Sequence, residues 1–165
     1  MTTAKPFRGR MACALAIVLA TAGPSAAEQP LNVLATVGMI ADVARGVVGD
    51  CAQVAALLGA GSDPHTHRAT PADVRKLAAA DLIFYVDPAL EARLADVLAG
   101  LSGRTSTVGL ARAAFEPALL LEDPDSPGTL DPHLWMDVSR WARIAPVIAD
   151  AVAARRPDCA AAMAD

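Results

Sequence analysis

Residues 51–74 read Cys-Ala-Gln-Val-Ala-Ala-Leu-Leu-Gly-Ala-Gly-Ser-Asp-Pro-His-Thr-His-Arg-Ala-Thr-Pro-Ala-Asp-Val. The apolar run 51–58 predicts a buried strand, which the glycine-rich residues 59–61 end. A polar loop follows, and a helix then begins with Thr70 as N-cap, Pro71 at the first position and Asp73 at the third. The stretch therefore predicts a strand, a loop and a helix, with the loop at the carboxyl end of the strand.

The rest of the chain repeats this alternation. Three further apolar or β-branched runs predict strands at 31–37, 81–86 and 105–110. Helical spacing of apolar residues predicts helices over 39–48, from Asp87-Pro88 to about residue 101, and after an N-cap at Asp137. Pro146 lies inside the last helix and should kink or split it. We expect an α/β fold: a single lobe with a mostly parallel four-stranded sheet flanked by helices, which binds ligands outside the carboxyl ends of its strands.

The first 27 residues have the pattern of a cleavable secretory signal peptide. Three basic residues precede an apolar run over 11–23, and small residues end the segment at Ala27. The run is shorter than the ~20 residues that span a bilayer, so we expect a periplasmic product without stable membrane insertion. The leader holds three of the 14 basic residues and none of the 18 acidic ones, which leaves a net charge of −7 for residues 28–165. Without a basic cluster, a nucleic-acid partner is not expected.

Two cysteines, Cys51 and Cys159, lie beyond the leader. An exported chain can oxidise such a pair to a disulfide, which requires Cα atoms within about 7 Å. Two separate, buried thiols are the alternative, and the sequence does not decide between them.

All three histidines of the chain fall in two short polar segments. His65 and His67 lie in Ser-Asp-Pro-His-Thr-His, residues 62–67, and His133 lies in Asp-Pro-His-Leu-Trp-Met-Asp, residues 131–137. Imidazole is a preferred ligand of zinc and other transition metals, and a preceding proline stiffens the backbone that carries it. Asp-Pro occurs four times in the chain, so a lone Asp-Pro-His would indicate only a turn. Two of three histidines in this context favour a shared metal site, with His65 and His133 as ligands.

Three nearby residues are predicted to support this site. Asp63 and Asp131 can accept hydrogen bonds from nearby backbone amides and hold each turn. His67, two residues from His65, would point away from it on an extended loop. We therefore place His67 in a supporting or solvent-exposed position, with ligation as the less favoured alternative. No nucleophile with a base, phosphate-binding loop or paired carboxylates stands out, and an enzyme is not expected.

Three segments in this order resemble the metal-binding proteins of zinc and manganese ABC importers, the cluster A-I solute-binding family. They are residues 61–74 around the first Asp-Pro-His, residues 80–85 (Ala-Asp-Leu-Ile-Phe-Tyr), and residues 131–138 around the second. The resemblance implies two Rossmann-like lobes joined by a long helix, with the metal between the lobes. It maps His65 and His133 onto two ligands from the first lobe, and it implies that the others come from a second lobe.

The leader pattern and the resemblance together divide the chain into a signal peptide at 1–27, an N-terminal metal-binding lobe at 28–138 and the start of an inter-lobe helix at 139–165. We expect a periplasmic protein that captures zinc or manganese as transported ligand for an ABC permease, without an organic cofactor and here as the N-terminal half. A non-functional, truncated fragment with a half-formed metal site is the alternative. Residues 111–130 contain no histidine, so they lack the His-rich loop of many zinc importers, and zinc is not favoured over manganese.

Overall fold

The computed structural model describes residues 29–86, 89–124 and 126–163. The expected leader, residues 1–27, lies outside them. The described chain forms a four-stranded sheet of β1 (Leu31–Ala35), β2 (Ala52–Ala56), β3 (Leu82–Tyr85) and β4 (Ser106–Gly109). The order is β2-β1-β3-β4, and every neighbouring pair is parallel. The expected α/β fold with a parallel sheet is confirmed. From β1 the chain first adds β2 on one side, and it then adds β3 and β4 on the other side. Parallel α/β sheets commonly bind ligands at such a reversal of strand order, here between β1 and β3.

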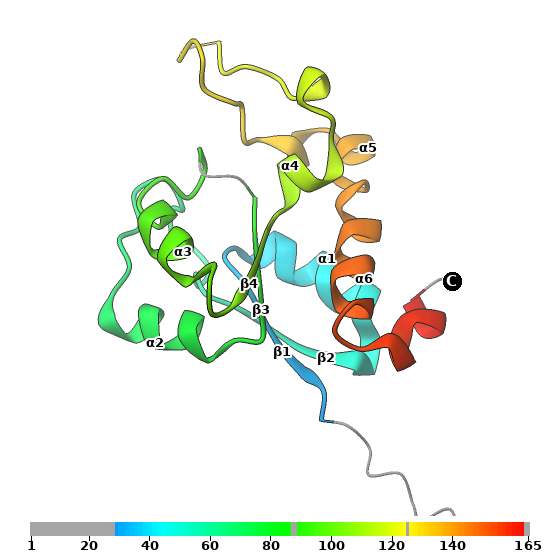
Figure 1. Cartoon of the computed structure of the whole chain (residues 1–165). Coiled ribbons are helices and arrows are strands. Elements are labelled where there is room, and N and C mark those ends of the chain that lie inside the picture. Colours follow the sequence, from blue (N-terminus) through cyan, green and yellow to red (C-terminus); the bar gives the residue numbers. More distant parts are fainter. Residues whose placement is uncertain (1–28, 87–88, 125, 164–165) are drawn as a thin grey trace, which may run out of the picture.

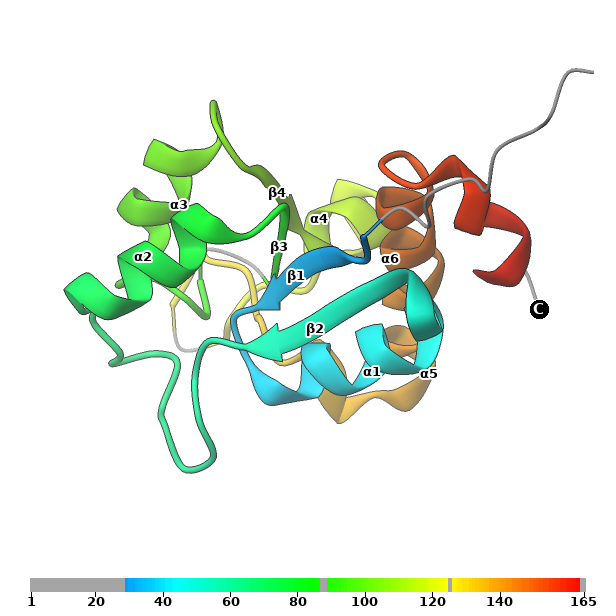
Figure 2. The same ribbon diagram turned by 90° about the horizontal axis from the view of Figure 1, so that it is seen from below.

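Helices cover both faces of the sheet (Figures 1 and 2). One face packs on α1 (Gly38–Val48), α4 (Leu110–Ala114) and α6 (Ile144–Ala153), and the other on α2 (Pro71–Ala79) and α3 (Ala95–Leu101). The side chains of each strand alternate between the faces because successive residues of a strand point in opposite directions. In β1, Val33 and Ala35 pack in the apolar cluster beneath α1, α4 and α6. Leu34 packs in the cluster beneath α2 and α3 on the other face. A sheet buried on both faces explains the continuous apolar runs.

The helix starts follow the predicted capping residues. The Thr70 side chain accepts from the Asp73 amide, and the Asp73 carboxylate accepts from the Thr70 amide, which completes the capping box of α2. The Asp137 carboxylate accepts from the amides of Ser139 and Arg140 at the start of α5 (Val138–Trp141). Both predicted N-caps are confirmed.

The helix predicted from Asp87 begins later than expected. Residues 87–88 lie outside the described part, residues 89–94 form turns, and α3 starts at Ala95. The apolar stripe read as one helical face is divided, because Leu90 packs in the α1 and α6 cluster whereas Leu94 and Leu98 pack in the α2 and α3 cluster. The intervening Glu91 is fully buried, and its hydrogen bonds to two strand ends hold these residues out of the helix.

The segment after Asp137 is divided into α5, α6 and a 3₁₀ segment, Pro157–Met163. Pro146 occupies the third position of α6, where its missing N–H costs no hydrogen bond, so the predicted split occurs just before it. Residues 139–163 are thus not one continuous helix, and a linking role for 139–165 stays a prediction. None of the described helices is long and apolar enough to cross a membrane.

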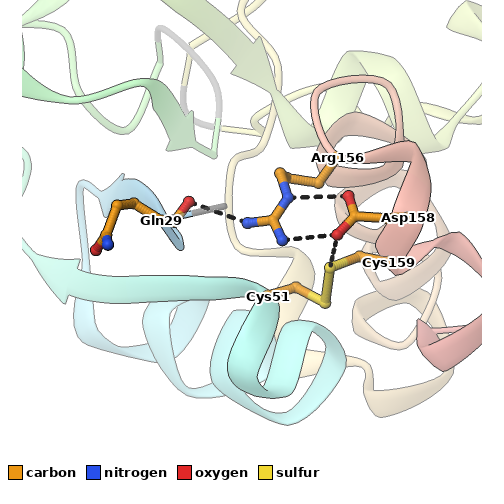
Figure 3. The surroundings of a disulfide bond; sticks show 5 residues. All are labelled: Gln29, Cys51, Arg156, Asp158 and Cys159. Atoms are coloured by element: carbon orange, nitrogen blue, oxygen red, sulfur yellow. Dashed lines mark hydrogen bonds and ion pairs between the residues drawn. A yellow bond between two sulfur atoms is a disulfide. The ribbon is translucent and has the colours of Figure 1, made fainter. Parts of the chain in front are cut away.

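A disulfide joins Cys51, just before β2, to Cys159 in the 3₁₀ segment, with Cα atoms 6.0 Å apart (Figure 3). Beside it Arg156 binds both carboxylate oxygens of Asp158 through Nε and Nη2, and its Nη1 donates to the Gln29 carbonyl. The choice that the sequence left open is thus settled in favour of a disulfide. The disulfide fastens the last described segment near the amino-terminal ends of β1 and β2. The histidine loops lie at the other, carboxyl-terminal ends of the strands.

Candidate metal centre

The two Asp-Pro-His turns lie together although their histidines, His65 and His133, are 68 positions apart in the sequence. The imidazole rings of His65 and His133 have centroids 5.6 Å apart and planes tilted by 43°. One metal ion bound by two imidazoles at metal–nitrogen distances of about 2.0–2.1 Å and a tetrahedral angle would place the ring centroids about 5 Å apart. The observed separation of the rings is therefore close to that of two imidazoles bound to one metal ion.

The loop between β2 and α2 carries His65 (Figure 2). One Asp63 carboxylate oxygen accepts from the His65 amide at 2.9 Å and the other from the Thr66 hydroxyl at 2.8 Å. These two donors, the Thr66 hydroxyl first, hold the pKa of the Asp63 carboxyl below its ordinary value. Asp63 is therefore ionised at neutral pH and fixes the turn, while the His65 side chain stays exposed.

The second turn repeats this arrangement and adds a bond to the ring. Asp131 Oδ1 accepts from the His133 amide at 2.9 Å and lies 2.7 Å from His133 Nδ1. The amide, and after it the ring, hold the pKa of the Asp131 carboxyl below its ordinary value. An ionised carboxylate can only accept, so Nδ1 carries the proton and Nε2 of neutral His133 remains free for a metal. Carboxylates commonly orient metal-binding histidines in this way.

Trp135 also supports His133, a role that the sequence pattern did not indicate. Its ring meets the His133 ring edge-on, with centroids 5.1 Å apart, and it packs in turn against Trp141. Trp135 is half-buried against the α1 and α6 cluster. The spacing of two residues after His133 was the only sequence signal, and spacing alone does not distinguish a supporting ring from a core residue.

His67 is held away from the pair formed by His65 and His133. Its Nε2 lies 3.2 Å from Asp73 Oδ2, within the capping box of α2. The Thr70 amide and hydroxyl, with a smaller contribution from His67, lower the pKa of the Asp73 carboxyl. His67 thus joins the loop to the helix that follows it.

Within the described residues, no group of three or more histidine, cysteine or acidic side chains is placed to hold a metal ion. The described part of the chain therefore offers the imidazoles of His65 and His133 as ligands. Both face solvent, and 42% of the His133 side chain is exposed. Two ligands leave at least two positions of a tetrahedral ion open.

Comparison with known proteins gives this geometry a context. A family described as the periplasmic component A of the zinc-uptake complex (ZnuA) matches residues 33–165. The chain belongs to the ZnuA family. The manganese-binding lipoprotein MntA of Bacillus subtilis is 36% identical over 122 residues, which cover 73% of this chain and 39% of MntA. The zinc-binding protein TroA of Treponema pallidum is 33% identical over 139 residues, which cover 79% of this chain and 44% of TroA.

Solved structures of ZnuA-like proteins share the fold. The periplasmic zinc-binding protein TroA superposes with a TM-score of 0.73 at 29% identity, over 79% of this chain and 46% of TroA. Zn(II)-bound AdcA from Streptococcus pneumoniae gives a TM-score of 0.68 at 28% identity, over 78% of this chain and 27% of AdcA. The chain thus spans less than half the length of these relatives, and this coverage fits an N-terminal lobe.

Proposed function

We propose that this chain captures a divalent transition metal, zinc or manganese, in the periplasm for delivery to an ABC import permease. His65 and His133 are two of the metal ligands, and groups from outside the described residues complete the site. The observation that carries this proposal is the 5.6 Å separation of the two rings, each on an Asp-Pro-His turn fixed by its own aspartate. The named relatives are binding proteins for zinc and manganese, which supports transport and not catalysis.

The donor chemistry agrees with a transported ion. Neutral imidazole binds zinc and manganese, and the two rings supply no charge that would make release costly. The rings are exposed, so an ion can enter and leave without opening a core. Two nitrogen ligands alone favour zinc over manganese in the usual affinity order, so selection of manganese would require oxygen ligands from outside the described residues.

A zinc titration monitored by calorimetry tests the assignment. We expect His65→Ala and His133→Ala each to weaken zinc binding by at least about tenfold, since each removes one of two ligands. His67→Ala is the matched control, because it removes an imidazole from the same loop and should change the affinity by less than about twofold. Unchanged binding in His65→Ala and His133→Ala, or an equal loss in His67→Ala, would contradict the assignment.

A further inference from the structure

Glu91 is a fully buried carboxylate at the carboxyl ends of the two central strands, and the proposed function does not use it. It is 0% exposed, and so is its partner Thr36. Its Oε1 accepts from the Thr36 hydroxyl at 2.6 Å and from the Val86 amide at 3.0 Å. Thr36 directly follows β1, and Val86 directly follows β3. One carboxylate oxygen therefore joins the ends of β1 and β3, where the winding of the chain reverses.

Further backbone hydrogen bonds link Thr36 and Val86, the two partners of this carboxylate, to the segment after β2 and to the start of α4. On one side, the Leu58 amide donates to the Thr36 carbonyl at 3.0 Å. On the other, the Ala111 amide donates to the Val86 carbonyl at 2.9 Å. The result is a row of bonds from the end of β2, through Glu91 at its centre, to the start of α4.

Each end of this row is connected to one of the two histidine turns, at one end along the chain and at the other by side-chain packing. Leu58 opens the loop that carries His65. Ala111 packs in a small apolar cluster with Phe115 and Leu134, and Leu134 directly follows His133. The row with Glu91 at its middle is thus connected to the first ring through the loop after Leu58, and to the second through the packing of Ala111 against Leu134.

We propose that Glu91 is a positioning residue that sets the separation of His65 and His133. The inference rests on the proposed metal-binding function and adds a residue that does not touch the metal. Burying a carboxylate is costly unless it is hydrogen-bonded, so loss of one partner should rearrange the strand ends that it joins. In a smaller fraction of molecules, the two imidazoles would then be positioned to bind the same metal ion.

Thr36→Val tests this with little change in shape, because it removes the hydroxyl donor and keeps the branched side chain. Outer partners of metal ligands typically change metal affinity 10–100-fold, and Thr36 lies further out, so we expect zinc affinity to fall about threefold to tenfold. Thr36→Ser keeps the donor and should restore the affinity. Glu91→Ala removes the centre of the row and should weaken binding at least as much as Thr36→Val.

A spectroscopic readout separates positioning from a general loss of stability. With Cu(II) as the probe, electron paramagnetic resonance should show two coordinated imidazoles in the unaltered chain and a mixture with one imidazole in Thr36→Val. Ile148→Ala is the control, because it opens a cavity beneath α6 and lowers the melting temperature but removes no donor or acceptor of the row. It should keep both the zinc affinity and the two-imidazole spectrum.

Three results would overturn the inference. They are an unchanged affinity and spectrum in Thr36→Val, a failure of Thr36→Ser to restore them, and an equal change in Ile148→Ala. Zinc binding that does not depend on His65 and His133 would instead remove the proposed function itself. The histidine variants therefore distinguish failure of the site from failure of the positioning role.

Discussion

The disulfide between Cys51 and Cys159 should contribute strongly to stability, because it closes a long loop. The two residues are 108 positions apart. In the chain-entropy description, a crosslink that closes about 100 residues removes about 4.7 kcal/mol of conformational freedom from the unfolded chain at 25 °C. Measured losses for native disulfides are about 2–5 kcal/mol. We expect the double variant Cys51→Ala/Cys159→Ala to lose a free energy of unfolding within that range.

Urea unfolding followed by circular dichroism measures this loss. The comparison is made on a Cys13→Ser background, so that the first cysteine of the chain does not exchange with the pair. Adding a reducing agent should shift the midpoint of the disulfide-bonded protein to lower urea and leave the double variant unchanged. The proposed metal site lies at the opposite end of the strands, so the zinc affinity of the folded double variant should stay within about twofold of that of the unaltered chain. Two free thiols in the unreduced protein, or equal unfolding midpoints with and without the pair, would refute the reasoning.

Two further predictions concern Asp131, in the second Asp-Pro-His turn, and Asp73, in the first turn of α2. Asp131→Ala removes the acceptor of the hydrogen bonds from the His133 amide and from its Nδ1. We expect the zinc affinity to fall about 10–100-fold in a calorimetric titration. An affinity equal to that of the unaltered chain would show that Asp131 does not orient the ring. Asp73→Ala breaks the α2 capping box, and we expect a loss of about 0.5–2 kcal/mol in urea unfolding at pH 7. Because the pKa of Asp73 is lowered on folding, its contribution is present above the unfolded value of about 3.9 and is lost as pH falls through the folded value. The difference from the unaltered chain should therefore narrow below about pH 4, and a constant difference from pH 7 to pH 3 would contradict the assignment.

Local signals in the sequence were sufficient for most of the fold. The apolar runs predicted all four strands, and Thr70, Asp73 and Asp137 marked two helix starts, because capping depends on residues within one turn of each other. The identity of a neighbouring strand depends on distant contacts, so the order β2-β1-β3-β4 came only from the structure.

The features that the sequence did not reveal depend on distant contacts. The stripe from Leu90 onward has helical spacing, but burial of Glu91 against Thr36 and Val86 outweighs that local preference. The pairing of Cys51 with Cys159 required the Cα separation, which spacing along the chain does not give. The two Asp-Pro-His segments were predicted as partners because two of the three histidines share this motif, and the structure places their rings together. Their role as ligands stays a proposal.

The number of imidazoles that the chain places on one zinc ion tests the central claim most directly. X-ray absorption spectroscopy of the zinc-loaded chain reports this number through the multiple scattering of the rings. We predict two imidazoles at about 2.0–2.1 Å, and one in either His65→Ala or His133→Ala. A spectrum with two imidazoles in both variants, or with none in the unaltered chain, would contradict a site built on His65 and His133.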